Sequence, residues 1–290
     1  MFTDIYSPVQ QLKHPILQQL WIKRDDLIDP YISGNKWRKL KYLLSKAQTE
    51  NKHHLVTFGG AYSNHLLATA AAASRAGLKS TAFVRGETVK NEMLMLCQLF
   101  GMTLQFVDRT SYKDKNSLFE QHFSNDPHAL FIDEGGASME AITGCAEIIA
   151  ELPTDIDHIF CAAGTGTTAA GLLKGIHDRG LKTTLHVVPA LKGGEFIGEE
   201  IFNYLGHTNQ LTLHTDYHFG GYAKTKPELI DFMKNFVSSQ GILIDPVYTA
   251  KMMYAIDDLS KKNHFREEEK IMAIHTGGLM GILGMKDKFL

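Results

Sequence analysis

Apolar segments and helix-forming segments alternate along most of the chain, and this alternation constrains the fold more than any other feature of the sequence. Segments with the composition of buried strands lie at 20–24, 54–58, 80–84, 104–107, 158–163 and 184–188, and two more are expected to end at Ile244 and Ile274. Segments with helical spacing lie at 39–48, 65–76 and 92–100, and glycines follow the last two. Strands that alternate with helices predict an α/β fold of open, mostly parallel sheets with helices on both faces.

The chain length leaves room for one large domain or two smaller ones, because 290 residues can bury a substantial core. The glycine-containing stretch from Asp133 to Thr143 is the best candidate for a crossing between domains. A second crossing is expected near residue 50. We therefore predict a small domain of residues 51–140, inserted into a large domain that residues 1–50 and 141–290 build.

Composition excludes several classes of function. A formal net charge of −2 provides no basic surface for nucleic acid or for an anionic membrane. Cys97, Cys145 and Cys161 form no CxxC pair, which disfavours a zinc site and a disulfide framework and favours a reducing compartment. The N-terminus does not resemble a signal peptide, and no apolar stretch approaches the roughly 20 residues of a membrane-spanning helix. We expect a cytoplasmic protein.

Lys36 is the most informative single residue. A lysine amine can form a Schiff base with an aldehyde cofactor. An isolated lysine near a helix start is usually a solvated surface charge, but here Lys36, Arg38 and Lys39 gather at a predicted helix N-terminus, where the helix dipole disfavours cations. Gly34 permits a close approach of the backbone, and Asn35 is expected to cap the helix. This arrangement suits an anion site or a lysine of lowered pKa.

A glycine- and threonine-rich turn far downstream can bind a phosphate through exposed backbone N–H groups. Its residues are Gly164, Thr165, Gly166, Thr167 and Thr168. The turn also fits the loose dinucleotide fingerprint, but the next strand ends in Val187-Val188-Pro189 without the acidic residue that binds a ribose. A terminal monophosphate therefore fits better than a pyrophosphate. Pyridoxal phosphate requires both a lysine and a phosphate site, so Lys36 and this turn together predict a pyridoxal-phosphate enzyme.

Three further segments place polar groups at strand ends. The turn Gly59-Gly60 leads to Ser63, which can present a hydroxyl and backbone amides to an anion or simply cap the next helix. Tyr248 and Thr276 also follow predicted strands, although a buried aromatic and a helix cap are equally good interpretations.

A metal site is not expected. The spacing His214-x-x-x-His218 could bind a metal on a helix, but Gly220-Gly221 follow at once and no third ligand is evident.

Taken together, these motifs resemble the family of D-cysteine desulfhydrase and 1-aminocyclopropane-1-carboxylate deaminase, which are pyridoxal-phosphate enzymes. The resemblance runs from about Trp21 to Gly278. It rests on five motifs in matching order: Lys23-Arg24-Asp25-Asp26, Gly34-Asn35-Lys36-Trp37-Arg38-Lys39-Leu40, Ser63-Asn64-His65, Asp245-Pro246-Val247-Tyr248 and His275-Thr276-Gly277-Gly278. It implies a tryptophan synthase β-like fold (fold type II) and a homodimer.

The resemblance also implies roles for individual residues. Lys36 would be the Schiff-base lysine, Asn64 would bind the phenolic oxygen of the cofactor, and Lys39 with the turn 164–168 would bind its phosphate. Tyr248, Thr249 and Thr276 would lie near the cofactor ring. The implied catalytic residues are Lys36, Ser63, Tyr222 and Tyr248, and the implied substrate-binding residues are Ser63, Asn64, His65 and Tyr222.

Two positions separate the two activities of the family. The deaminases carry a glutamate after the motif tyrosine and a leucine in the His-x-Gly-Gly motif, where this chain has Thr249 and Thr276, the desulfhydrase pattern. A carboxylate beside the pyridine nitrogen keeps it protonated and deepens the electron sink, whereas a hydroxyl leaves it closer to neutral. Since a thiolate leaves readily, the shallower sink suffices for β-elimination.

The sequence thus predicts a pyridoxal-phosphate lyase that converts D-cysteine to pyruvate, hydrogen sulfide and ammonia. Another D-amino acid such as D-serine could be the substrate. The alternatives are a 1-aminocyclopropane-1-carboxylate deaminase that releases 2-oxobutanoate, a nucleotide-dependent oxidoreductase, and a non-catalytic carrier or sensor of pyridoxal phosphate.

Overall fold

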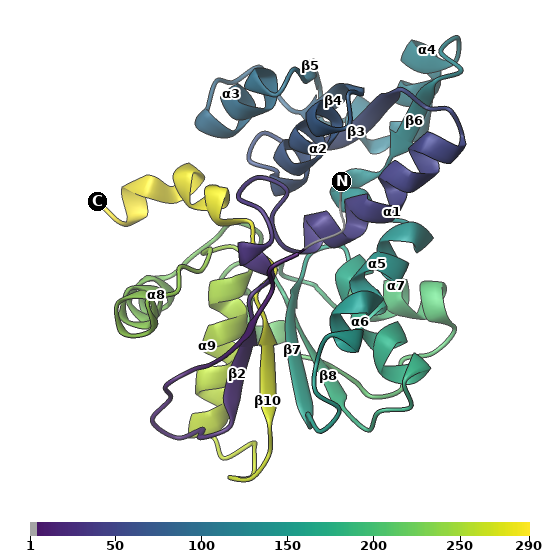
Figure 1. The fold of residues 1–290 in the computed structure, drawn as a ribbon. Helices are drawn as coiled ribbons and strands as arrows, with labels where there is room; N and C mark the ends of the chain where they lie inside the picture. Colours follow the sequence, from purple (N-terminus) through teal and green to yellow (C-terminus); the bar gives the residue numbers. More distant parts are fainter. Residues whose placement is uncertain (1–4) are drawn as a thin grey trace.

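Two sheets flanked by helices make up the protein, whose computed structural model describes residues 5–290 (Figure 1). The six-stranded sheet has the order β1 (Val9–Gln11), β2 (Leu20–Lys23), β10 (Ile271–Ile274), β7 (His158–Ala163), β8 (Thr184–Pro189) and β9 (Leu211–Leu213). All its neighbouring strands are parallel except β1 and β2. The four-stranded sheet is parallel, with the order β5 (Thr103–Val107), β4 (Lys79–Arg85), β3 (His54–Gly60) and β6 (Ala129–Ile132). The predicted α/β fold is confirmed.

Nine α-helices lie among the described residues. They are α1 (Asn35–Thr49), α2 (Asn64–Arg75), α3 (Glu92–Leu99), α4 (Lys115–Phe123), α5 (Met139–Ala150), α6 (Thr167–Asp178), α7 (Phe196–Leu205), α8 (Pro227–Gln240) and α9 (Thr249–Lys261). The 3-10 segments are four short turns, η1 (Asp25–Leu27), η2 (Ser111–Lys113), η3 (Glu134–Gly136) and η4 (Thr215–His218), and the longer η5 (Leu279–Lys288). No helix of residues 5–290 combines the length and the apolar character needed to cross a membrane.

Helices cover both faces of the six-stranded sheet because its central strands are buried on both sides. Along β7, Phe160 and Ala162 belong to the core that α8 and α9 cover. Ile159 and Cys161, which point to the opposite face, belong to the core that α5, α6 and α7 cover. Figure 1 shows these two helix layers on either side of the sheet. Such doubly covered parallel strands read as continuous apolar runs, which is why they were recognisable in the sequence.

The strands of the four-stranded sheet all lie between residues 54 and 132, within the range predicted for the small domain. The boundaries at residues 50 and 140 themselves stay a prediction. Helix α1, which precedes residue 50, packs in one apolar cluster with α2, β3 and β6. It therefore contacts the four-stranded sheet although the chain reaches it from the other sheet.

Two local predictions were wrong. The run that ends at Ile244 is not a strand. Gly241 ends α8 with a φ of +65°, and Pro246, which cannot donate a backbone hydrogen bond, follows soon after. In addition, β10 pairs directly with both β2 and β7, so the sheet has no room for another strand beside β10. The predicted break from Asp133 to Thr143 is also shorter than expected, because Ser138 accepts a hydrogen bond from the amide of Ala141 and α5 begins at Met139.

Three histidines form a hydrogen-bonded row across the six-stranded sheet. Nδ1 of His158 lies 2.9 Å from Nε2 of His186, and Nδ1 of His186 lies 2.8 Å from Nε2 of His214. The ring of Phe160 stacks on His186 with centroids 4.4 Å apart. The row thus engages Nε2 of His214. Among the described residues no group of three or more metal-ligating side chains occurs.

This histidine row is expected to make the fold sensitive to acid. Burial, with smaller effects of neighbouring histidines, lowers the pKa of His186 to about 2 and that of His214 to about 4. Since the unfolded chain binds these protons near pH 6.5, the free energy of unfolding should decrease as the pH falls from about 6.5 toward 4, by roughly 2 kcal/mol per histidine at pH 5. Urea titrations at pH 7, 6 and 5 measure it. His186→Leu should reduce the slope, whereas replacement of the exposed His53 by Gln should not; equal slopes in all three proteins contradict the explanation.

Candidate active site

The predicted site residues gather where strands of both sheets end, beside the first turn of α1. β3 leads into Ser63, β7 leads into Gly164, and β10 leads into Thr276. Ligands of open parallel sheets usually bind at the carboxyl ends of the strands. Figure 1 shows α1 between the four-stranded sheet and α5. The lysine at the start of α1 therefore lies at the junction of the two sheets.

The loop before Lys36 is locked against the loop after β10. Gly34 has a φ of +59°, and a Cβ at this position would lie 1.9 Å from the carbonyl oxygen of Thr276. The amide of Asn35 donates to that same oxygen at 3.2 Å. Only glycine allows this approach. Two motifs that lie about 240 residues apart in the sequence are thus one local structure, and Gly34 fixes where Lys36 begins the helix.

Lys36 occupies a desolvated, positively charged environment. Burial, with a smaller effect of Lys39, lowers the pKa of Lys36 to about 7, and no hydrogen bond or ion pair of its ammonium group occurs within residues 5–290. Nζ of Lys39 donates to the carbonyl of Gly135 at 3.0 Å. Burial and the two lysines hold the pKa of His65 well below its ordinary value. A neutral amine is therefore accessible at Lys36 near pH 7, and the surroundings favour an anion.

The glycine-threonine turn forms an anion-binding helix start. Gly166 adopts a left-handed conformation with a φ of +81°, and α6 begins at Thr167. The first amides of a helix have no acceptor within it, so they can bind an anion. Oγ1 of Thr165 lies 3.2 Å from Oγ1 of Thr167. Nδ2 of Asn35 donates to Oγ1 of Thr168 at 2.9 Å, which joins this turn to the helix of the lysine.

The segment of Ser63, Asn64 and His65 begins α2 and reaches the same place. A Cβ at Gly278 would lie 2.6 Å from Nδ2 of Asn64, so Asn64 lies against the loop that follows β10. Nε2 of His65 and Oγ1 of Thr57 are 2.7 Å apart, while the buried Nδ1 of His65 has no hydrogen-bond partner among the described residues. Ser63 is the N-cap residue of α2, but its side chain makes no capping hydrogen bond. Its hydroxyl is therefore not committed to the helix.

Tyr248 and Thr249 stand at the start of α9, held by the carboxylate of Asp245. This carboxylate accepts the amides of Tyr248 at 2.8 Å and of Thr249 at 2.9 Å. A Cβ at Gly164 would lie 3.2 Å from the ring of Tyr248, whose hydroxyl donates to that of Tyr222 at 3.5 Å. Burial raises the pKa of Tyr248 well above its ordinary value. Oγ1 of Thr249 is buried and has no hydrogen-bond partner within the described chain.

Two expectations about α1 were wrong. The N-cap residue is Gly34, and Asn35 bonds to Thr168 instead of capping the helix. Arg38 does not add charge to the anion site, because its buried guanidinium binds the carboxylates of Asp25 and Glu151. Sequence reasoning also missed the contact of Lys39 with Gly135, since Gly135 belongs to the stretch that was taken as a simple crossing.

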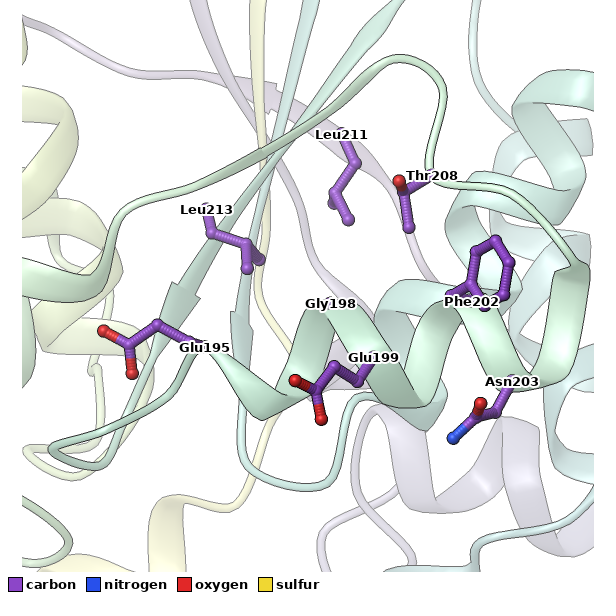
Figure 2. A pocket seen from close by; sticks show the side chains of 8 residues that line it. All are labelled: Glu195, Gly198, Glu199, Phe202, Asn203, Thr208, Leu211 and Leu213. Carbon is purple, nitrogen blue, oxygen red and sulfur yellow. The ribbon is translucent and has the colours of Figure 1, made fainter.

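A separate open groove of about 630 Å³ lies between α7 and β9 (Figure 2). It is lined by Glu195, Gly198, Glu199, Phe202, Asn203, Thr208, Leu211 and Leu213. None of these residues is among the predicted site residues that lie beside the first turn of α1. The groove is therefore distinct from the candidate active site.

The residues at α1 fit pyridoxal phosphate. A desolvated lysine amine without a hydrogen-bonding partner suits an aldehyde, and the start of α6 suits a monophosphate. The buried unpaired hydroxyl of Thr249 suits a ring nitrogen. These three features come from three different segments, and each matches a different part of the same cofactor.

Comparisons with known proteins agree with this chemistry. The sequence model of a family described as "Pyridoxal-phosphate dependent enzyme" matches residues 6–277. A Pyrococcus horikoshii protein named "Putative 1-aminocyclopropane-1-carboxylate deaminase" is 32% identical over 306 residues, which cover 98% of this chain and 93% of that protein. The mitochondrial "Bifunctional D-cysteine desulfhydrase/1-aminocyclopropane-1-carboxylate deaminase" of Arabidopsis thaliana is 29% identical over 299 residues, with coverages of 93% and 75%.

A solved structure described as an "ACC deaminase homologue" superposes with a TM-score of 0.86 at 29% identity and covers 99% of this chain and 94% of that one. This likeness agrees with the predicted fold type II. The family match spans nearly the whole chain and includes all the segments that meet at α1. The chain therefore belongs to the family of pyridoxal-phosphate dependent enzymes.

Proposed function

We propose that this enzyme is a lyase that converts D-cysteine and water to pyruvate, hydrogen sulfide and ammonia. The observation that carries the choice of substrate is the buried hydroxyl of Thr249, which has no partner among the described residues. The nearest carboxylate of the motif, Asp245, is already engaged by the backbone amides at the start of α9. A hydroxyl in this position suits the elimination of a good leaving group such as a thiolate.

In this proposal, bound pyridoxal phosphate supplies an aldehyde for amines and a conjugated ring that accepts an electron pair from the α-carbon. Lys36 would hold the cofactor through Nζ, and its free amine would take the α-proton of the substrate. A lysine whose pKa is about 7 can do this, because much of it is neutral at physiological pH. Lys39 and the first amides of α6 hold the phosphate.

Ser63 and Asn64 are proposed to bind the substrate and the edge of the cofactor. Both stand at the N-terminus of α2, where backbone amides and the helix dipole favour a carboxylate. Tyr222 is exposed and in contact with the partly buried Tyr248. We propose that Tyr222 meets the substrate side chain and that Tyr248 lies against the cofactor, with Ser63 or either tyrosine as the second acid-base group.

The alternative is a 1-aminocyclopropane-1-carboxylate deaminase. The names of the Pyrococcus horikoshii relative and of the solved homologue favour it, and the Arabidopsis relative is named for both activities. Thr249 and Thr276 argue against it, since they stand where the deaminases carry a glutamate and a leucine.

The deciding experiment compares substrates on one preparation. We expect sulfide and pyruvate in equal amounts from D-cysteine, and a kcat/KM for 1-aminocyclopropane-1-carboxylate at least roughly tenfold lower. Thr249→Glu should reduce sulfide release at least about tenfold, because it buries a carboxylate where the reaction uses a hydroxyl. Thr143→Glu, on the exposed face of α5, is the matched control. Faster release of 2-oxobutanoate than of sulfide assigns the deaminase, and preferred turnover of D-serine replaces the proposed substrate.

A further inference from the structure

A buried lysine outside the cofactor site gathers three backbone carbonyl groups. Lys251 lies in the first turn of α9 and is 0% exposed. Its Nζ donates to the carbonyl oxygens of Ala190 at 2.9 Å, of His218 at 2.8 Å and of Gly221 at 2.9 Å. We call these four residues the carbonyl clasp. Three donors meet three acceptors, so the hydrogen-bonding capacity of the ammonium group is filled.

This placement is unfavourable for a lysine by itself. Burial lowers the pKa of Lys251 to about 8, against a smaller opposing effect of Asp245. The dipole of α9 also disfavours a cation in its first turn. Within residues 5–290 the partners of its Nζ are these three carbonyl groups and no carboxylate. The three carbonyl groups are therefore what keeps the ammonium group in this position, much as rings of carbonyl oxygens hold a bare monovalent cation.

The carbonyl clasp binds the segment 218–222 to α9, and most of this segment belongs to no helix or strand. Phe219, Gly220 and Gly221 have φ values of +52°, +97° and +120°, a run of conformations that backbone hydrogen bonds of helices and strands do not support. Gly221 is a clasp residue, and Tyr222 follows it directly. Tyr248, the contact of Tyr222, lies three residues before Lys251 on α9.

We propose that Lys251 is a positioning residue that acts as a built-in monovalent cation: its three carbonyl bonds fix the 218–222 segment on α9 and so hold Tyr222 against Tyr248 at the substrate side of the active site. This inference rests on the proposed function for the role of Tyr222. Lys251 itself contacts neither substrate nor cofactor. Its removal should therefore impair the handling of the substrate and leave the binding of pyridoxal phosphate intact.

Lys251→Ala tests this idea because it leaves the three carbonyl groups facing a space that a small cation fits. In the cofactor-loaded variant we expect kcat/KM for D-cysteine to fall at least about tenfold, with the cofactor absorption retained. Ammonium chloride should raise its thermal unfolding midpoint and restore part of its activity, while sodium chloride at equal concentration should not. The parent and Lys262→Ala, an exposed lysine at the end of α9, should respond equally to both salts.

Lys251→Met is the second variant, since its side chain fills the space without a charge. It should show the same loss of kcat/KM for D-cysteine without any response to ammonium. If the alanine variant does not fold, the methionine variant alone tests the loss of kcat/KM. In a Tyr222→Ala background the loss caused by Lys251→Met should shrink, because both changes act through the same side chain.

The proposal is overturned if Lys251→Met retains the parent kcat/KM, if the two losses are additive, or if the alanine variant responds alike to ammonium and sodium. Should the parent release no sulfide from D-cysteine, the proposed function fails, and the unfolding midpoints in the two salts still decide whether the clasp behaves as a cation site.

Discussion

Lys36→Ala is expected to reduce the turnover of D-cysteine by about a thousandfold or more, which is the largest effect on activity that the structure predicts. The amine of Lys36 is the group that can both hold the cofactor and move a proton, and its pKa of about 7 reflects a desolvated site that no neighbouring carboxylate neutralises. Sulfide release measures activity. Borohydride treatment followed by mass spectrometry should attach pyridoxal phosphate to the parent chain and not to the variant.

The matched control is Lys46→Ala on the same helix. Lys46 is partly exposed and paired with Glu140, so its loss should leave both readouts unchanged. The unfolding midpoint of Lys36→Ala without cofactor should stay within a few degrees of the parent, because the variant gives up only a desolvated ammonium group without hydrogen bonds. Turnover of the variant at a rate comparable to the parent, or attachment of the cofactor to another lysine, removes the basis of the proposed function.

Seven strands (β2, β3, β4, β5, β7, β8 and β10) and the helices α1, α2 and α3 were predicted, because each is built from local information, whereas β1, β6 and β9 were missed. The segment of β7 is apolar on both faces and was recognised from 158 to 163, the bounds that the structure gives it. The run that ends at Ile244 is just as apolar, but it is not a strand. The place between β2 and β7 is taken by β10, which lies about 30 residues further along the chain. Sequence patterns report burial, and they do not report which strand takes a given edge.

The residues of the candidate site could be named from the sequence, although their roles stay a prediction, whereas their contacts could not. Lys36 and the turn from Gly164 to Thr168 are chemically distinctive, whereas the fit of Gly34 against Thr276 depends on two loops that only the fold brings together. Lys251 escaped notice because a lysine in a helix reads as a surface charge, and its three carbonyl partners carry no sequence signature. Contacts with backbone groups are invisible in a list of side chains.

The largest effect on stability is expected from Asp25, which lies with Arg38 in a fully buried ion pair. The guanidinium of Arg38 donates to Asp25 through Nε at 3.1 Å and Nη2 at 2.9 Å, and both side chains are 0% exposed. Although burial acts against it, hydrogen bonds to Glu151 and Asp25 raise the pKa of Arg38 above its ordinary value. Lys23 completes the network through Glu151 at 2.7 Å.

Asp25→Ala should lower the free energy of unfolding by about 3–5 kcal/mol, since it leaves part of a buried guanidinium without a partner. Urea unfolding of the parent and the variant at pH 7 measures this difference. Asp178→Ala is the control, because Asp178 pairs with Lys174 on the exposed surface of α6 and should contribute less than about 1 kcal/mol. Equal costs for the two aspartates contradict the assignment of a buried network.

A double variant with Arg38→Met distinguishes two causes of the lower free energy of unfolding: the loss of the ion pair and the unpaired charge that Asp25→Ala leaves on Arg38. If the cost of Asp25→Ala arises from the orphaned guanidinium, adding Arg38→Met should recover part of it, whereas an effect of lost packing at Asp25 should persist in the double variant. The result bears on the site as well, because Arg38 follows Lys36 by two residues and anchors the first turn of α1. Asp25→Ala should therefore also reduce turnover at temperatures where the variant is still folded, because the first turn of α1 would then position Lys36 less rigidly.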